Sequence, residues 1–302
     1  MISKLFWRYE RSRSYPALAR HAQVRRTFTY GSQGTINVLT VPKCMDEAVW
    51  SLWSWMRVLE GKVTPRLFVD GIVTAEHRSL FEDNFPGIQV HELRPWLAQR
   101  QDLGPQLRKL ISAFPLGGKA ALVAALSQDG PAVYSDSDIL AFNRPAQLID
   151  GLSGDKPQYM LDRYGSNYGP AVVSAVRDQY LSQPDQVNLG LTVLSNNCLN
   201  LASLETFLER FAGWEQLGQS WFSEQTLVAL MMSVAKGEPL KRDDYVVSLD
   251  RQFVFERDVD YRHIAVRHFT GPVRHVMYLK GIPFLIKQMA MKQADMKPAE
   301  RT

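Results

Sequence analysis

From residue 35 onward, short runs of β-branched and large apolar residues alternate with longer segments of helical periodicity. This alternation predicts an α/β domain, because helices that follow strands return the chain to the same edge of a sheet. Connections of this kind place neighbouring strands parallel. The expected elements are strands at 35–41, 65–71, 88–93 and 186–195, a strand leading into a Gly-Pro loop at 262–275, and helices at 45–61, 74–86, 118–130, 201–213 and 221–237.

The composition indicates a large folded core and a reducing compartment. Of the 302 residues, 45% are hydrophobic, which is enough to build a core without covalent help. Cys44 and Cys198 are the only cysteines, so a disulfide framework and a Cys-rich zinc site are excluded. The first residues lack the apolar centre of a secretory signal, and no run approaches the ~20 apolar residues that span a bilayer. We therefore expect a cytoplasmic protein.

The positive charge of the chain is concentrated at its N-terminus. Residues 1–31 hold seven Lys or Arg residues and a single acid, Glu10. A basic arm with aromatic residues can bind an anionic membrane surface, with roughly 1 kcal/mol for each charge near the interface. A solvated N-terminal extension explains the same composition. Nucleic-acid binding has only this arm in its favour, and no module signature accompanies it, so we expect no nucleic-acid partner.

The chain divides into three predicted parts: a basic arm at 1–34, a main domain at 35–280 and a C-terminal helix or tail at 281–302. The last of these carries apolar residues beside several lysines between residues 284 and 302. We expect it to pack as an ordinary terminal helix that frays at its end. A helix lying on a membrane is the alternative, so peripheral membrane association stays open.

Two aspartates mark the predicted end of a fourth strand, in the stretch VYSDSDILAF at 133–142. Open α/β sheets bind ligands beyond the carboxyl ends of their strands, and carboxylates are the ligands that Mg²⁺ and Mn²⁺ prefer. Asp136 and Asp138 therefore predict a metal site, with a solvated turn as the alternative. A second pair, Asp258 and Asp260, lies among charged residues and is typical of a turn.

A histidine occupies a similar position later in the chain. His268 ends the apolar alternation in RHIAVRHFTGPVRH and precedes a Gly-Pro loop. One imidazole nitrogen and two carboxylates suit Mn²⁺ and leave positions open for a diphosphate. In the same loop, Gly271 would let the backbone approach phosphates closely, and Arg274 would oppose their charge.

These segments resemble a known family. YSDSDIL looks like the Asp-x-Asp strand end of GT-A glycosyltransferases, and HFTGPVRH resembles the His-x-x-Gly-x-x-Lys signature of glycosyltransferase family 8, which includes glycogenin-like and lipopolysaccharide galactosyltransferase-like enzymes. VNLGLTVLS is similar to the family's Asn-Ala-Gly strand, and SEQTLVALM to its Asp-Gln helix start. The resemblance covers residues 35–280 and implies a single catalytic domain with a GT-A, Rossmann-like fold, in which a mostly parallel sheet is flanked by helices.

The resemblance also implies roles for particular residues. Asp136, Asp138 and His268 would hold Mn²⁺ or Mg²⁺ against the diphosphate of a nucleotide sugar, such as a UDP-hexose. Donor contacts would come from residues on several elements, namely Thr40, Lys119, Asp136, Gly190, Gly271 and Arg274. Asn188 would line the sugar pocket, with Glu224 holding sugar hydroxyls and Gln225 orienting the sugar. Family members retain anomeric configuration. The acceptor would be a glycan, or a lipid-linked acceptor if the basic arm and the C-terminal tail place the enzyme at the inner membrane face.

Several departures from the family pattern keep other functions open. Arg274 replaces the usual Lys, Leu189 a small Ala, and Glu224 an Asp. A sugar nucleotidyltransferase is one alternative, although no glycine-rich phosphate loop follows the first strand. A non-catalytic nucleotide- or carbohydrate-binding protein on the same fold is the other.

Overall fold

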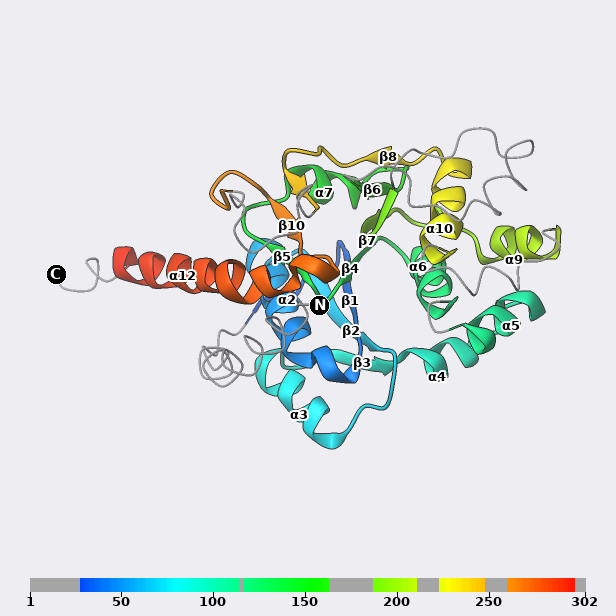
Figure 1. Cartoon of the computed structure of the whole chain (residues 1–302), viewed down its shortest axis with the longest axis horizontal. Helices are drawn as coiled ribbons and strands as arrows, with labels where there is room; N and C mark the ends of the chain where they lie inside the picture. The colour runs from blue at the N-terminus through cyan, green and yellow to red at the C-terminus, as the bar shows by residue number, and fades with distance from the viewer. Residues whose placement is uncertain (1–27, 115–116, 163–186, 211–222, 248–259, 297–302) are drawn as a thin grey trace.

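The computed structural model of the chain describes residues 28–114, 117–162, 187–210, 223–247 and 260–296 (Figure 1). The strands are β1 (Gly34–Thr40), β2 (Val63–Val69), β3 (Gln89–Glu92), β4 (Ala132–Asp136), β5 (Ile139–Ala141), β6 (Gln158–Leu161), β7 (Val187–Leu194), β8 (Glu238–Pro239), β9 (Tyr245–Val246) and β10 (Val266–His268). The helices are α2 (Met45–Val58), α3 (Ala75–Asn84), α4 (Leu93–Ala98), α5 (Pro105–Ala113), α6 (Gly117–Asp129), α7 (Ala146–Gly151), α9 (Leu201–Arg210), α10 (Ser223–Val234), α11 (Arg274–Val276) and α12 (Ile282–Met296).

The central sheet has seven strands in the order β3-β2-β1-β4-β7-β6-β8. Strands β3, β2, β1 and β4 are parallel neighbours, as predicted, whereas β7 runs antiparallel to both β4 and β6. Strands β5, β10 and β9 form a second, three-stranded sheet. The predicted α/β class with a mostly parallel central sheet is confirmed.

Helices cover both faces of the central sheet because its strands are apolar on both sides (Figure 1). Val133 of β4 packs into a core with the apolar face of α2, while its neighbours Ala132 and Tyr134 point to the opposite face and pack with α6 and α10. This alternation is the two-residue period of a strand. Helix α2 ends at Val58, just before Gly61, which has a positive φ of 72°.

Some elements differ from the predictions. The strand expected within 262–275 is limited to β10, and a 3-10 turn at Gly271–Val273 follows it. Helices α4 and α5 and the second sheet were not predicted. The strands of the second sheet, β5, β9 and β10, have only two or three residues each, which is too short for a periodic pattern. They are held by pairing with one another.

Several predictions lie wholly or partly outside the described residues: most of the basic arm (1–27), Asp258, the last turn of the helix expected at 201–213, and the chain end at 297–302. Their domain boundaries stay predictions. Within the described part, α12 extends away from the sheet (Figure 1). No helix among the described residues combines the length and the apolar character needed to cross a bilayer.

Candidate active site

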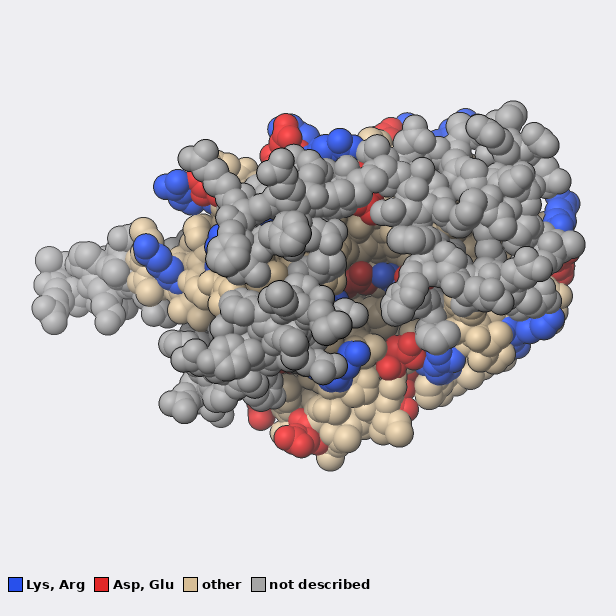
Figure 2. Space-filling view, viewed as in Figure 1, with Lys and Arg blue, Asp and Glu red and all other residues tan. Residues whose placement is uncertain are grey.

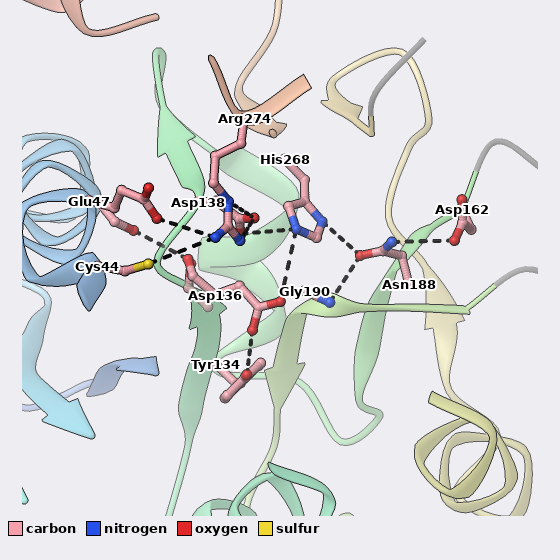
Figure 3. A network of polar contacts seen from close by, with 12 residues as sticks. Cys44, Glu47, Tyr134, Asp136, Asp138, Asp162, Asn188, Gly190, His268 and Arg274 are labelled. Carbon is pink, nitrogen blue, oxygen red and sulfur yellow. Dashed lines mark hydrogen bonds and ion pairs between the residues drawn. The ribbon is translucent and has the colours of Figure 1, made fainter. Parts of the chain in front are cut away.

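Two strand ends meet beside the C-terminal edge of β4. Strand β5 pairs antiparallel with β10, which puts His268 opposite Ile139. The backbone N–H of Phe269 donates to the carbonyl of Asp138 at 2.8 Å, so the turn after β4 is fixed against the end of β10. The sheet pairing therefore brings Asp136, Asp138 and His268 together (Figure 3).

The three side chains offer ligand atoms that all lie within 4.8 Å of one another. His268 Nε2 is 3.1 Å from Asp138 Oδ1 and 3.9 Å from Asp136 Oδ2. Asp138 and His268 are buried, whereas Asp136 reaches the surface with 22% of its side chain exposed. Asp138 Oδ1 is buried and accepts no hydrogen bond from the described residues. A buried acceptor beside an imidazole nitrogen and a second carboxylate fits a divalent cation.

The ring of His268 is oriented by Asn188. The backbone N–H of Gly190 donates to Asn188 Oδ1 at 2.9 Å, which identifies that atom as the amide oxygen. His268 Nδ1 lies 2.9 Å from the same oxygen and must therefore donate a proton to it. Nε2 is then turned toward Asp136 and Asp138. A hydrogen bond on the far nitrogen is the usual means of fixing a metal-binding histidine.

The Asp136 carboxylate is held from the other side by two donors. Lys119 Nζ, at the start of α6, lies 2.9 Å from Oδ2, and the hydroxyl of Tyr134 donates to Oδ1 at 2.5 Å. Burial lowers the pKa of Lys119, but the charges of Asp136 and Glu224 outweigh it and raise the pKa overall. The lysine therefore stays charged beside the carboxylate. Tyr134 shares a strand face with Asp136 because the two are separated by two positions.

Arg274 approaches the other aspartate. Its Nε lies 3.1 Å from Asp138 Oδ2, and its Nη2 also bonds that oxygen. Burial raises the pKa of Asp138, but Arg274 and His268 hold it well below its ordinary value. Arg274 Nη1 lies 3.6 Å from Oε2 of Glu47, at the start of α2. The guanidinium thus bridges two carboxylates.

The first turn of α10 contributes two further polar groups. Burial raises the pKa of Glu224 to about 7, with Lys119 lowering it and Asp136 raising it. The Glu224 carboxyl is therefore close enough to Lys119 and Asp136 to interact with their charges. Oε2 of Glu224 and Nε2 of Gln225 are both buried without a hydrogen bond from the described residues. Unpartnered buried polar atoms of this kind indicate a place for polar ligand groups.

Two of the proposed donor contacts lie less directly on the cluster. Thr40 is buried, and its hydroxyl donates to the carbonyl of Cys44 at 3.1 Å, within the turn that begins α2. Its contact with a base or ribose stays a prediction. A Cβ added at Gly271 would meet no atom of the described residues within 4 Å. Asp260, from the second acidic pair, forms an exposed ion pair with Arg262 at 2.6 Å.

Sequence reasoning missed three residues of this network. Asp162 Oδ2 lies 3.4 Å from Asn188 Nδ2 and follows β6, a strand that was not recognised. Tyr134 could have been found, since it is two positions from Asp136 in an expected strand. In the sequence, Glu47 is typical of an acid in the first turn of a helix, and its contact with the distant Arg274 is visible only in the structure.

In the space-filling view, acidic and basic side chains lie together inside a hollow near the middle of the face (Figure 2).

No protein-family model matches the sequence, and no curated protein matches it either. Solved structures do match. Galactosyltransferase LgtC, in complex with donor and acceptor sugar analogs, is 12% identical with a TM-score of 0.55, over 84% of this chain and 95% of that one. Mouse xyloside xylosyltransferase 1, in its apo form, is 11% identical with a TM-score of 0.50, over 80% of this chain and 98% of that one.

The bifunctional glycosyltransferase WbbM, also in its apo form, is 12% identical with a TM-score of 0.51, over 88% of this chain and 52% of that one. These identities are low, so the likeness concerns the fold. It agrees with the mostly parallel seven-stranded sheet flanked by helices. The chain has the GT-A fold of these glycosyltransferases.

Proposed function

We propose that this protein is a metal-dependent glycosyltransferase that moves a hexose from a UDP-linked donor to a glycan or lipid-linked acceptor, with retention of configuration. The observation that carries the proposal is the convergence of Asp136, Asp138 and His268 at the end of β4 in a GT-A sheet. Carboxylate and imidazole ligands suit Mn²⁺ or Mg²⁺. A divalent cation held there would supply Lewis-acid stabilisation of the charge that grows on a leaving diphosphate.

The chain's own residues bind and orient the donor around that cation. Arg274 and Lys119 carry charged N–H groups beside the two aspartates and would bind the diphosphate oxygens. Asn188 keeps the Nε2 atom of His268 directed at the site. Since Asp136 and Lys119 are partly exposed, the diphosphate can approach without unfolding of the sheet edge.

The first turn of α10 supplies the groups for the sugar. Glu224 and Gln225 have buried polar atoms that the described residues leave without hydrogen bonds, and sugar hydroxyls would supply those partners. Retaining hydrolases use two carboxyl groups about 5 Å apart, one of them as nucleophile. We assign no nucleophile, and we propose front-face substitution in which Gln225 stabilises the oxocarbenium-like transition state.

The acceptor part of the proposal draws on two observations. LgtC has been solved with both donor and acceptor sugar analogs, which supports a sugar acceptor for a chain of the same fold. The basic composition of residues 1–31 supports work at the cytoplasmic face of a membrane, on a lipid-linked acceptor. Co-sedimentation with anionic liposomes, for the full chain and a chain lacking residues 1–30, tests the membrane contact; equal pelleting would remove the arm from the proposal.

The proposed function is tested first by thermal unfolding with UDP, GDP, CDP, TDP and ADP, each with Mn²⁺ and again with excess EDTA. A ligand at a hundredfold excess over its Kd stabilises the folded state by about 2.7 kcal/mol, which shifts the unfolding temperature by several degrees. We expect UDP to give a shift that EDTA abolishes. Absence of a shift with every nucleotide would contradict the proposal.

Matched variants then separate the metal site from general charge effects. Asp136→Asn should abolish the EDTA-sensitive shift and sugar transfer, while Asp260→Asn, in the exposed second acidic pair, should leave both unchanged. Near-normal transfer by Asp136→Asn would rule out the metal assignment. Nucleotide binding without transfer to any acceptor would favour a non-catalytic binding protein.

A further inference from the structure

Glu47 is a buried carboxylate that the reaction above does not use. It lies in the first turn of α2 with no exposed side-chain surface. Its Oε1 accepts a hydrogen bond from the Tyr278 hydroxyl at 2.9 Å. Its Oε2 is buried and accepts no hydrogen bond from the described residues. Glu47 Oε2 can therefore accept a hydrogen bond from a further donor.

The available oxygen is directed at Arg274. Arg274 Nη1 lies 3.6 Å from Glu47 Oε2, which is close enough for an ion pair but too far for a good hydrogen bond. The other edge of the same guanidinium, through Nε and Nη2, bonds Asp138 Oδ2. Arg274 thus lies between two carboxylates and makes full hydrogen bonds with only one of them (Figure 3).

Occupation of the metal site, through Oδ1 of Asp138, would weaken the contact that Arg274 makes with Oδ2 of the same carboxylate. Asp138 is a proposed ligand, and a divalent cation beside it would repel the guanidinium that already neutralises it. The Arg274 side chain is 26% exposed, and its Nη1 already lies 3.6 Å from Glu47 Oε2, so only a small movement separates the guanidinium from a hydrogen bond with Glu47. Turning toward Glu47 would give Oε2 its missing hydrogen bond. It would also release the edge of the guanidinium that had bonded Asp138.

We propose that Glu47 is a positioning residue for Arg274. When a divalent cation takes Asp138, Glu47 receives the guanidinium, and the N–H groups that leave Asp138 are presented to the diphosphate. In the absence of the cation, Arg274 neutralises Asp138 in its place. This inference depends on the metal site of the proposed function, but it assigns a role to a residue outside that site.

The test is a calorimetric titration of the nucleotide-free protein with Mn²⁺, and with Mg²⁺ in parallel. The variants are Glu47→Gln, Arg274→Gln and the double variant, with Asp46→Asn as the matched control. Asp46 lies in the same helical turn, and its Oδ2 is 3.0 Å from the Tyr278 hydroxyl oxygen, so its variant removes a carboxylate charge from the same turn while leaving Glu47 beside Arg274.

We expect Glu47→Gln to weaken Mn²⁺ binding by about tenfold, because the displaced arginine loses its second partner. Asp46→Asn should change the affinity by less than about threefold, because it leaves the Glu47 carboxylate in place beside Arg274. Arg274→Gln should tighten Mn²⁺ binding, and adding Glu47→Gln to it should have no further effect. Equal weakening by Glu47→Gln in both backgrounds would overturn the inference, since Glu47 would then act through its own charge.

The remaining outcomes are also decisive. If Glu47→Gln does not fold, Arg274→Gln alone tests the competition, and weaker Mn²⁺ binding by that variant overturns the inference. If wild-type protein binds Mn²⁺ but Glu47→Gln matches Asp46→Asn, only the role of Glu47 is wrong. If the wild-type protein binds neither cation, the metal dependence of the proposed function and this inference are both wrong.

Discussion

Asn188 Oδ1 lies 2.9 Å from His268 Nδ1 and accepts a hydrogen bond from the backbone N–H of Gly190 at the same distance. The amide is therefore locked by the strand that carries it, and in turn it locks the imidazole. Since Nδ1 must donate, Nε2 is the atom presented to the two aspartates. The family resemblance implied a sugar-pocket role for Asn188, and the geometry adds a role in orienting His268, a proposed metal ligand.

Loss of this amide should weaken metal binding. Asn188→Ala removes the acceptor for the imidazole proton, and changes of this kind beside metal ligands typically reduce affinity by about 10- to 100-fold. We expect that loss in a Mn²⁺ titration, with Asn188→Asp, which keeps an acceptor oxygen, retaining more affinity than Asn188→Ala. Wild-type affinity in Asn188→Ala would show that the histidine needs no such support.

Gly190 should be intolerant of a side chain for a related reason. A Cβ at this position would lie 2.2 Å from Cε1 and 2.4 Å from Nδ1 of His268, so the ring would have to leave its place. We expect Gly190→Ala to lose at least about tenfold in Mn²⁺ affinity. Gly154→Ala is the control, since its Cβ would meet nothing closer than 3.4 Å. Similar titrations of the two variants would contradict this packing account.

Lys119 should contribute to turnover through charge. Its Nζ is 2.9 Å from Asp136 and is mostly buried, so Lys119→Met removes a fixed positive charge from the proposed diphosphate site. Loss of one such contact often costs ~10²-fold in rate. We expect that reduction in transfer assays, whereas Lys109→Met, at an exposed position on α5, should transfer sugar as the wild type does. Equal rates for the two variants would remove Lys119 from the site.

Glu224 should make stability depend on pH. Burial raises its pKa from 4.5 to about 7, with Asp136 adding to the shift and Lys119 opposing it. The stability that comes from the protonated form is fully present below about pH 4.5 and is lost as the pH rises through 7. The free energy of unfolding of Glu224→Gln, relative to that of the wild type, should therefore increase by on the order of 2 kcal/mol between pH 5 and pH 8.

Denaturant unfolding at the two pH values measures that gain. Glu209→Gln, on the exposed side of α9, is the control and should follow the wild type at both. If the difference in the free energy of unfolding between Glu224→Gln and the wild type is the same at pH 5 and pH 8, the Glu224 carboxyl is charged at both pH values.

The local parts of the fold could be predicted, because a buried strand or an amphipathic helix leaves a periodic pattern. This holds for β1, α2, β2, α3 and β3, whose bounds agree with the expected ranges to within about three residues. The second sheet could not be predicted, because β5, β9 and β10 are short and depend on partners far along the chain. The antiparallel direction of β7 likewise has no local signature.

The candidate site divides in the same way. Asp136 and His268 end their strands and Asp138 follows two residues after β4, and strand ends can be recognised in sequence. Asp162 follows β6, whose four residues were not recognised as a strand. Glu47 has the pattern of a helix-start acid, which any helix can show. Its contact with Arg274 arises only from the packing of α2 against the C-terminal part of the domain.

The pairing of β5 with β10 also fixes when the site can form during synthesis. Asp138 and Arg274 are 136 positions apart, and the ribosome releases the N-terminal partner first. The strands β1 to β4 can pair while His268 and Arg274 are still to be made. A nascent chain that ends before residue 260 would carry Asp136 with its partner Lys119, but Asp138 without the counter-charge of Arg274. The proposed cation site is thus completed late, when β10 pairs with β5 and closes a long loop.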